Sequence, residues 1–138
     1  MFLTLIVVLL ASLAPAAQGS SSSTPTAVPV LLTLTEESAS RVFARVKAES
    51  TLSADEAAAA AKTAAAAQAV RVKQQQDRIL DALKQQPYRA SLIYRLDRNT
   101  NAIAVRIDSS FVPQLRKLAG VRSVALIATD VTTPKKSP

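Results

Sequence analysis

A long segment without any helix-breaking residue constrains the fold of this 138-residue chain more than any other feature. Between Ser53 and Pro87 there is neither glycine nor proline, and alanine, the residue with the highest helix propensity, fills residues 57–61 and 64–67. Ser53 and Glu56 have the spacing of a capping box, in which each side chain bonds to the backbone N–H of the other residue. The sequence therefore predicts a helix that begins after Ser53 and continues to Pro87.

Only the second half of this predicted helix carries side chains large enough to pack against a sheet. Its apolar stripe recurs at steps of three and four residues. The stripe consists of Ala65, Ala69, Val72, Gln76, Ile79 and Leu83, with Leu80 beside it. We expect residues 70–86 to dock on the rest of the domain, and we interpret the glutamines at 74–76 and the alanine runs as helix filler.

Segments of alternating apolar and polar residues on both sides of the helix predict strands. They are residues 41–47, 90–96, 102–107 and 121–128. The five polar residues at 97–101 predict a hairpin turn, because Asn and Asp favour turn conformations. A short second helix is expected from Ser109 or Ser110 to Ala119, with a serine cap, Pro113 in its first turn and Gly120 as its C-terminal stop.

This order predicts an α+β fold of the ferredoxin-like βαββαβ type, an antiparallel four-stranded sheet with two helices on one face. The other face of the sheet has no internal cover, so a partner is expected to bind there. Residues 28–35 are apolar enough for a further strand, but Pro29 restricts such a strand to an edge or a strand start. The role of this segment is left open.

The N-terminus has the pattern of a secretory signal. Residues 2–13 form a 12-residue apolar run followed by Ala14-Pro15-Ala16-Ala17, which is too short for a membrane span of about 20 residues. Cleavage is expected after Ala16. The predicted organisation is a signal peptide at 1–16, a flexible linker at 17–40, a folded domain at 41–128 and a disordered tail at 129–138. We expect a secreted, periplasmic or extracellular protein with no membrane contact after signal removal.

The composition excludes most self-contained catalysis. The chain contains no His and no Cys, so it cannot form a Ser-His-Asp triad, a cysteine nucleophile, a disulfide or a zinc site built from these residues. We expect no enzymatic activity, no metal and no cofactor. All 17 Lys and Arg residues lie after residue 40, against 8 of the 10 acids. This balance is compatible with an acidic protein, nucleic acid or an anionic surface as partner.

Two sequence patterns near the C-terminus resemble the closing half of subtilisin propeptides, the propeptide-like inhibitors of subtilases. They are Asn101-Ala102-Ile103-Ala104-Val105 and Val112-x-x-Leu115-x-x-Leu118-Ala119-Gly120-Val121-x-x-Val124. The resemblance covers residues 41–127 and is strongest toward the C-terminal end. Ala102 and Ala119 depart from the family, which usually has Gly and Pro there. The family also commonly has an acid soon after the last strand, whereas the first acid here is Asp130.

The resemblance implies an inhibitor and intramolecular chaperone of a subtilisin-like serine protease, acting in trans, or in cis if the chain is truncated. In that family the open sheet face packs on two protease helices, and the segment after the last strand lies in the active-site cleft. The implied sheet contacts are Tyr94, Leu96, Ala102 and Ala104, and the implied cleft segment is Leu126, Ile127, Ala128, Thr129 and Asp130. Asp130 is the candidate acid for capping the protease helices.

Two other functions remain open from the sequence. A secreted structural or adhesion module would have the same signal and the same fold without a protease partner. An RNA-recognition domain shares the βαββαβ order but needs stacking aromatic residues on its central strands. Only Tyr94 is a plausible stacking residue, and export argues against RNA as a partner, so we expect no nucleic-acid binding.

Overall fold

The computed structural model describes residues 26–128, which form an antiparallel sheet of four strands with helices packed on it. The strands are β1 (Ala27–Leu34), β2 (Ser91–Leu96), β3 (Ala102–Asp108) and β4 (Val121–Leu126), in the spatial order β2-β3-β1-β4. The helices are α1 (Ala39–Glu49), α2 (Ala54–Lys84) and α3 (Val112–Leu115), with a 3-10 turn at Ser109–Phe111 before α3. The predicted α+β class and four-stranded antiparallel sheet are confirmed.

The predicted first strand, residues 41–47, is wrong: it lies within α1. Its alternating pattern also fits a helix, because Val42 and Val46 are four residues apart and share one helical face. Val42 is buried and Val46 half-buried, whereas Ala44, which a strand would place on their side, is exposed. The true first strand is β1, which lies inside the predicted linker 17–40, so this linker assignment is also wrong from residue 27 onward.

β1 is a central strand even though it contains Pro29. The backbone N–H of Ile127 donates to the Pro29 carbonyl at 3.0 Å. Because the N–H and C=O of one strand residue point to the same side, the missing N–H of Pro29 also faces β4. β4 ends at Leu126, next to this position. The proline therefore lies where the ladder on that side is already ending. Of the two expected placements, the edge strand is wrong, whereas Pro29 does lie near the start of β1, as its third residue.

Helix α2 begins at the predicted N-cap and ends three residues before Pro87. The Glu56 carboxylate accepts hydrogen bonds from the Ser53 backbone N–H at 3.2 Å and from its hydroxyl at 2.6 Å. The predicted stripe is confirmed in the second half of the helix, where Val72, Gln76, Ile79, Leu80 and Leu83 are buried. In the first half, Ala65 is half-buried and Ala69 is exposed, while Ala57, Ala61 and Gln68 are buried instead.

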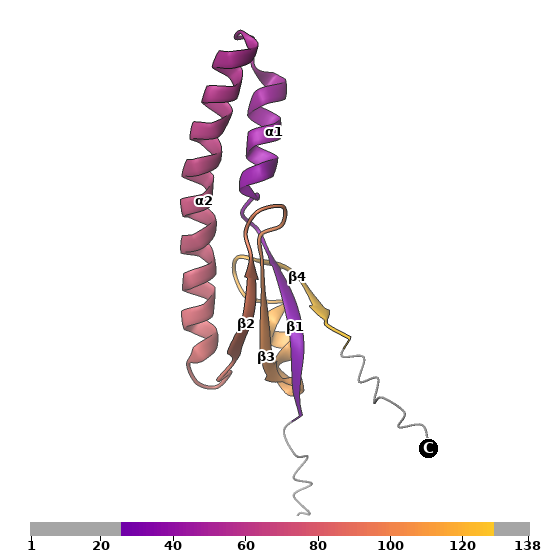
Figure 1. Cartoon of the computed structure of the whole chain (residues 1–138). Coiled ribbons are helices and arrows are strands. Elements are labelled where there is room, and N and C mark those ends of the chain that lie inside the picture. Colours follow the sequence, from indigo (N-terminus) through magenta and orange to yellow (C-terminus); the bar gives the residue numbers. More distant parts are fainter. Residues whose placement is uncertain (1–25, 129–138) are drawn as a thin grey trace, which may run out of the picture.

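The first half of α2 packs against α1 rather than against the sheet. Figure 1 shows these two helices as an antiparallel pair that extends beyond the end of the strands. The alanine side chains of this half permit close approach of α1, whose buried residue is Val42. Residues 57–67 therefore pack in a helical pair, a role not predicted from the sequence.

The main core lies between one face of the sheet and the helices α2 and α3. β1 and β3 contribute alternate residues to it, and α2 contributes Ile79, Leu80 and Leu83. The strand residues are Val30, Leu32 and Leu34 from β1, and Ile103, Val105 and Ile107 from β3. Leu115 of α3 is fully buried in the same cluster, so both helices cover the same face (Figure 1).

The segment between β3 and β4 is less helical than predicted, because only Val112–Leu115 is α-helix. Asp108 rather than a serine caps its start: the Asp108 carboxylate accepts from the Ser110 backbone N–H at 2.8 Å. Gly120 has φ of +89°, as expected for the residue that ends a helical turn. Within residues 26–128, no helix combines the length and apolarity needed to cross a bilayer.

Candidate functional site

The side of the sheet opposite α2 and α3 is the candidate functional surface. Side chains alternate between the two faces of a strand, so the residues between the core positions of β1 and β3 point to this side. The strand register adds their neighbours on β2 and β4. We call this surface the helix-free face; it comprises Pro29, Leu31, Thr33, Ser91, Tyr94, Leu96, Ala102, Ala104, Arg106, Ser123 and Ala125.

The structure brings the four predicted sheet contacts together on this face. Tyr94 lies opposite Ala104, and Leu96 lies opposite Ala102. Both alanines have 0% exposed surface, whereas Tyr94 and Leu96 are 43% and 40% exposed. Tyr94 and Leu96 can therefore contact a partner directly, while the alanines fill the space between larger neighbours on β1 and β2. The prediction that Ala102 and Ala104 belong to the face is correct, but they offer no free contact area.

The residues that β1 adds to this face were not predicted from the sequence. Leu31 lies opposite Ala104, and Thr33 lies opposite Ala102. Both side chains are half-buried. The signal was present in the apolar segment 28–35, but Pro29 and the assignment of the first strand to residues 41–47 kept it outside the predicted domain. Arg106 was also missed, although it follows the predicted alternation of β3.

The chain leaves the sheet from the edge strand β4. Leu126 is 67% exposed at the end of this strand, and Ala128 is exposed two residues later. The bond from Ile127 to Pro29 is the last described contact of the segment with the sheet. Thr129 and Asp130, the remaining predicted cleft residues, lie outside the described residues.

A buried network of amide side chains fixes the Leu96 end of the helix-free face. The Gln76 amide donates to the Leu96 carbonyl at 2.9 Å and to the Asn101 side-chain oxygen at 3.1 Å. The Asn101 amide donates in turn to the Gln75 side-chain oxygen at 2.8 Å and to the Glu36 carbonyl at 3.1 Å. Gln75 and Gln76 therefore join α2 to the β2–β3 turn and to the β1–α1 connection. The interpretation of these glutamines as filler is wrong.

An ion pair on the helix side of β2 involves Arg95 and Asp77 of α2, whose nearest side-chain atoms are 2.6 Å apart. The hydrogen bond from Arg95 lowers the pKa of Asp77 below its ordinary value. Arg106 differs, because the structure gives it no ion pair with any acid of residues 26–128. The cation on the helix-free face therefore has no ion-pair partner in the described part of the chain.

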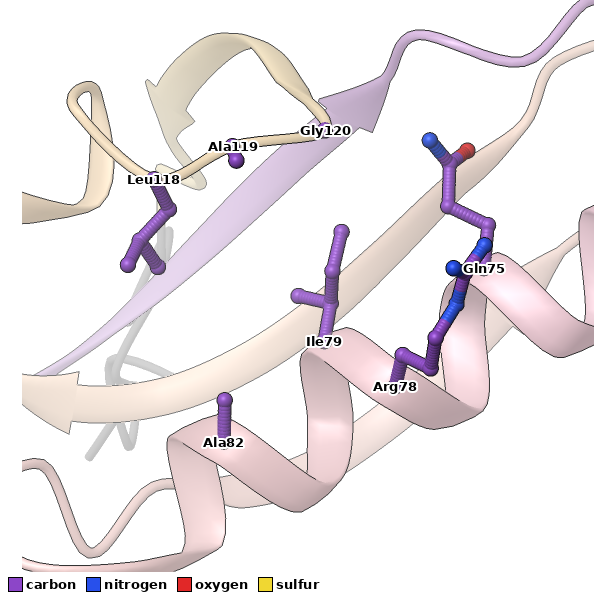
Figure 2. A pocket seen from close by; sticks show the side chains of 7 residues that line it. All are labelled: Gln75, Arg78, Ile79, Ala82, Leu118, Ala119 and Gly120. Atoms are coloured by element: carbon purple, nitrogen blue, oxygen red, sulfur yellow. The ribbon is translucent and has the colours of Figure 1, made fainter.

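Figure 2 shows a hollow of about 320 Å³ on the helix side, between α2 and the connection from α3 to β4. Ile79 and Ala82 line it from α2, and Leu118, Ala119 and Gly120 lie across from them. Gln75 and Arg78 provide its polar side chains. The hollow has neither a nucleophile nor a general base, so it offers no catalytic arrangement. Elsewhere in residues 26–128, no cluster of acids could hold a metal ion.

Comparison of the chain with protein-family models, with curated proteins and with solved structures finds no match. Two features of the structure bear on function: the helix-free face and the exit of the chain from β4.

Proposed function

We propose that this domain is a propeptide-like inhibitor and folding chaperone of a subtilisin-like serine protease, acting in trans or, if the chain is truncated, in cis. The observation that carries the proposal is the helix-free face, a side of an otherwise well-packed sheet that exposes Tyr94 and Leu96. Exposed large apolar side chains clustered on one face are typical of protein interaction sites. The resemblance of residues 101–124 to subtilisin propeptides supplies the class of partner.

The strand order supports a ferredoxin-like arrangement for the domain. β3 lies between β1 and β2 and is antiparallel to both. β1 and β2 are therefore parallel to each other and separated by one strand, as in a split βαβ unit. In this proposal α2 and α3 are the two helices of the ferredoxin-like unit, and α1 is an addition between β1 and α2.

The exit from β4 supports a role for the following segment in the protease cleft. An extended segment that leaves an edge strand can add to the strands of a partner through main-chain hydrogen bonds. In our proposal the segment from Leu126 to Asp130 occupies the active-site cleft as a cleaved product would. Asp130 is the proposed cap for the helices of the protease.

The domain would then act by binding and not by catalysis. A chain without His and Cys can inhibit in this way, because occupying a cleft needs no catalytic side chain of its own. We propose that the protein is secreted or periplasmic and that residues 1–16 direct its export. No cofactor, nucleic acid or membrane surface takes part in this mechanism.

An inhibition assay tests the proposal. The purified chain is titrated into a subtilisin-type protease, and peptide hydrolysis and cleavage of the chain are followed over time. We expect slow, tight inhibition with slow cleavage of the chain. A variant that ends at Ala128 keeps the bond between Ile127 and Pro29 and should lose most of the inhibition. Absence of inhibition by the intact chain at high micromolar concentration would contradict the proposal.

A further inference from the structure

Arg106 is the one cation among the residues named for the helix-free face, and Asp108 is the next residue that the alternation of β3 places on the same side. It lies on the central strand β3, opposite Pro29 of β1 and Ser91 of β2, neither of which carries charge. Its side chain is exposed. Asp108, two residues further along β3, accepts from the Ser110 backbone N–H at 2.8 Å and forms no ion pair with Arg106. Among residues 26–128, Arg106 is thus a cation without an ion pair, beside the apolar residues of this face.

A partner that covers this face also removes Arg106 from water. Desolvation of an unpaired charge is costly, and a buried charge is therefore normally paired or hydrogen-bonded to an oppositely charged group. A guanidinium group also forms bidentate hydrogen bonds with a carboxylate, which fixes the relative orientation of the two groups. A partner surface that is purely apolar at this position would leave the Arg106 charge buried and unpaired, which would weaken binding.

We propose that Arg106 selects the protease partner by pairing with a carboxylate side chain on the apolar protease surface that covers Tyr94 and Leu96. This inference rests on the proposed docking of the helix-free face. The carboxylate would belong to the surface of the protease outside its cleft, so selection by Arg106 is separate from selection by the segment after β4. Proteases with a neutral or basic residue at that place would bind the domain more weakly.

The test compares inhibition constants of the full chain and its variants against one subtilisin-type protease at several NaCl concentrations. R106Q removes the charge, R106E reverses it and R106K retains it without the planar group. R116Q is the matched control, because Arg116 is an exposed arginine at the C-terminal end of α3, on the other side of the sheet. The melting temperature of each variant shows whether the domain is still folded.

We expect R106Q to weaken inhibition about tenfold or more and R106E about a hundredfold or more. R106K should stay within about tenfold of the wild type, and R116Q within about twofold. The salt dependence of inhibition should also be smaller for R106Q than for the wild type.

Equal inhibition by the wild type and R106Q would overturn this inference alone and leave the inhibitor function in place. Equal losses in R106Q and R116Q would also overturn it, because they would indicate an effect of net charge and not of a specific pair. No inhibition by the wild type would instead contradict the inhibitor function and this inference together.

Discussion

The glutamine network gives a prediction whose size follows from the structure. Gln76 is 2% exposed, and its amide donates to the Leu96 carbonyl and to the Asn101 side-chain oxygen. Methionine has nearly the same length and shape as glutamine and favours helices equally well. The variant Q76M therefore removes these two hydrogen bonds, and a longer one to the Ala102 carbonyl at 3.5 Å, while leaving the packing volume and the helix propensity almost unchanged.

The expected loss comes from one buried acceptor, on Asn101, and one partly buried acceptor, on Leu96. The Asn101 side-chain oxygen loses its donor, and the Leu96 carbonyl loses its bond to α2. Each buried polar group left without a partner costs about 1–3 kcal/mol. Burial of the methionine side chain offsets part of this loss, so we expect Q76M to destabilise the domain by about 2–4 kcal/mol. For a domain of this size that corresponds to a decrease in Tm of about 10–25 °C.

Urea and thermal unfolding of the full chain, followed by circular dichroism, measure this loss. The matched control is Q74M, since Gln74 belongs to the same run of glutamines and is exposed. We expect Q74M to change the free energy of unfolding by less than about 0.5 kcal/mol. If Q76M were no less stable than Q74M, the reasoning that the network holds α2 to the β2–β3 turn would be refuted.

Three further changes test other parts of the structure. G120A should destabilise the domain by about 1–2 kcal/mol or more in urea unfolding, because Gly120 has φ of +89° and an added Cβ would lie 3.3 Å from two side chains of α2. D77N should lower Tm at neutral pH and not at about pH 2. The hydrogen bond from Arg95 lowers the pKa of Asp77 in the folded state. The stabilisation is therefore present above the unfolded-state pKa and is lost as the pH falls through the folded-state pKa. Y94S should weaken protease inhibition about tenfold or more with little change in Tm, whereas L52S, which removes an exposed apolar side chain between α1 and α2, should leave inhibition unchanged.

Local signals in the sequence were sufficient for α2, the β2–β3 hairpin and the turn at Gly120. The capping box and the absence of breakers define α2 without reference to the rest of the chain. The polar residues between the two hairpin strands place the turn at 97–101, where the structure has it. Each of these features depends on residues close to one another in the sequence, which is why sequence reasoning could reach it.

The identity of the first strand depended on contacts that the sequence does not display. Residues 41–47 fit a strand and a helix about equally well, and the packing of Val42 on α2 decides between them. The assignment of β1 depended on where β4 ends relative to Pro29, which only the three-dimensional pairing determines. The glutamines were misread for the same reason, since their partners are 20 or more residues away in the sequence.

The candidate site was predictable where it follows from β2 and β3. The resemblance to subtilisin propeptides implied Tyr94, Leu96, Ala102 and Ala104 as contacts on one face, and the register of β2 and β3 places all four on the same side. Alternation alone does not give exposure, however, and the two alanines are covered because larger side chains flank them on both neighbouring strands. The missing half of the face, on β1, could not be placed while that strand was assigned to a linker.

The network and the helix-free face are linked through Leu96. Its side chain belongs to the surface that we propose as the docking site, while its carbonyl is bonded to Gln76 on the opposite side of the molecule. β2 is an edge strand with an irregular register between Leu92 and Tyr94, so strand pairing holds it from one side only. The bond to α2 restrains the end of this strand before any partner arrives. A surface ordered in advance loses less conformational entropy on binding, and a long, Ala-rich helix can thereby contribute to affinity without touching the partner.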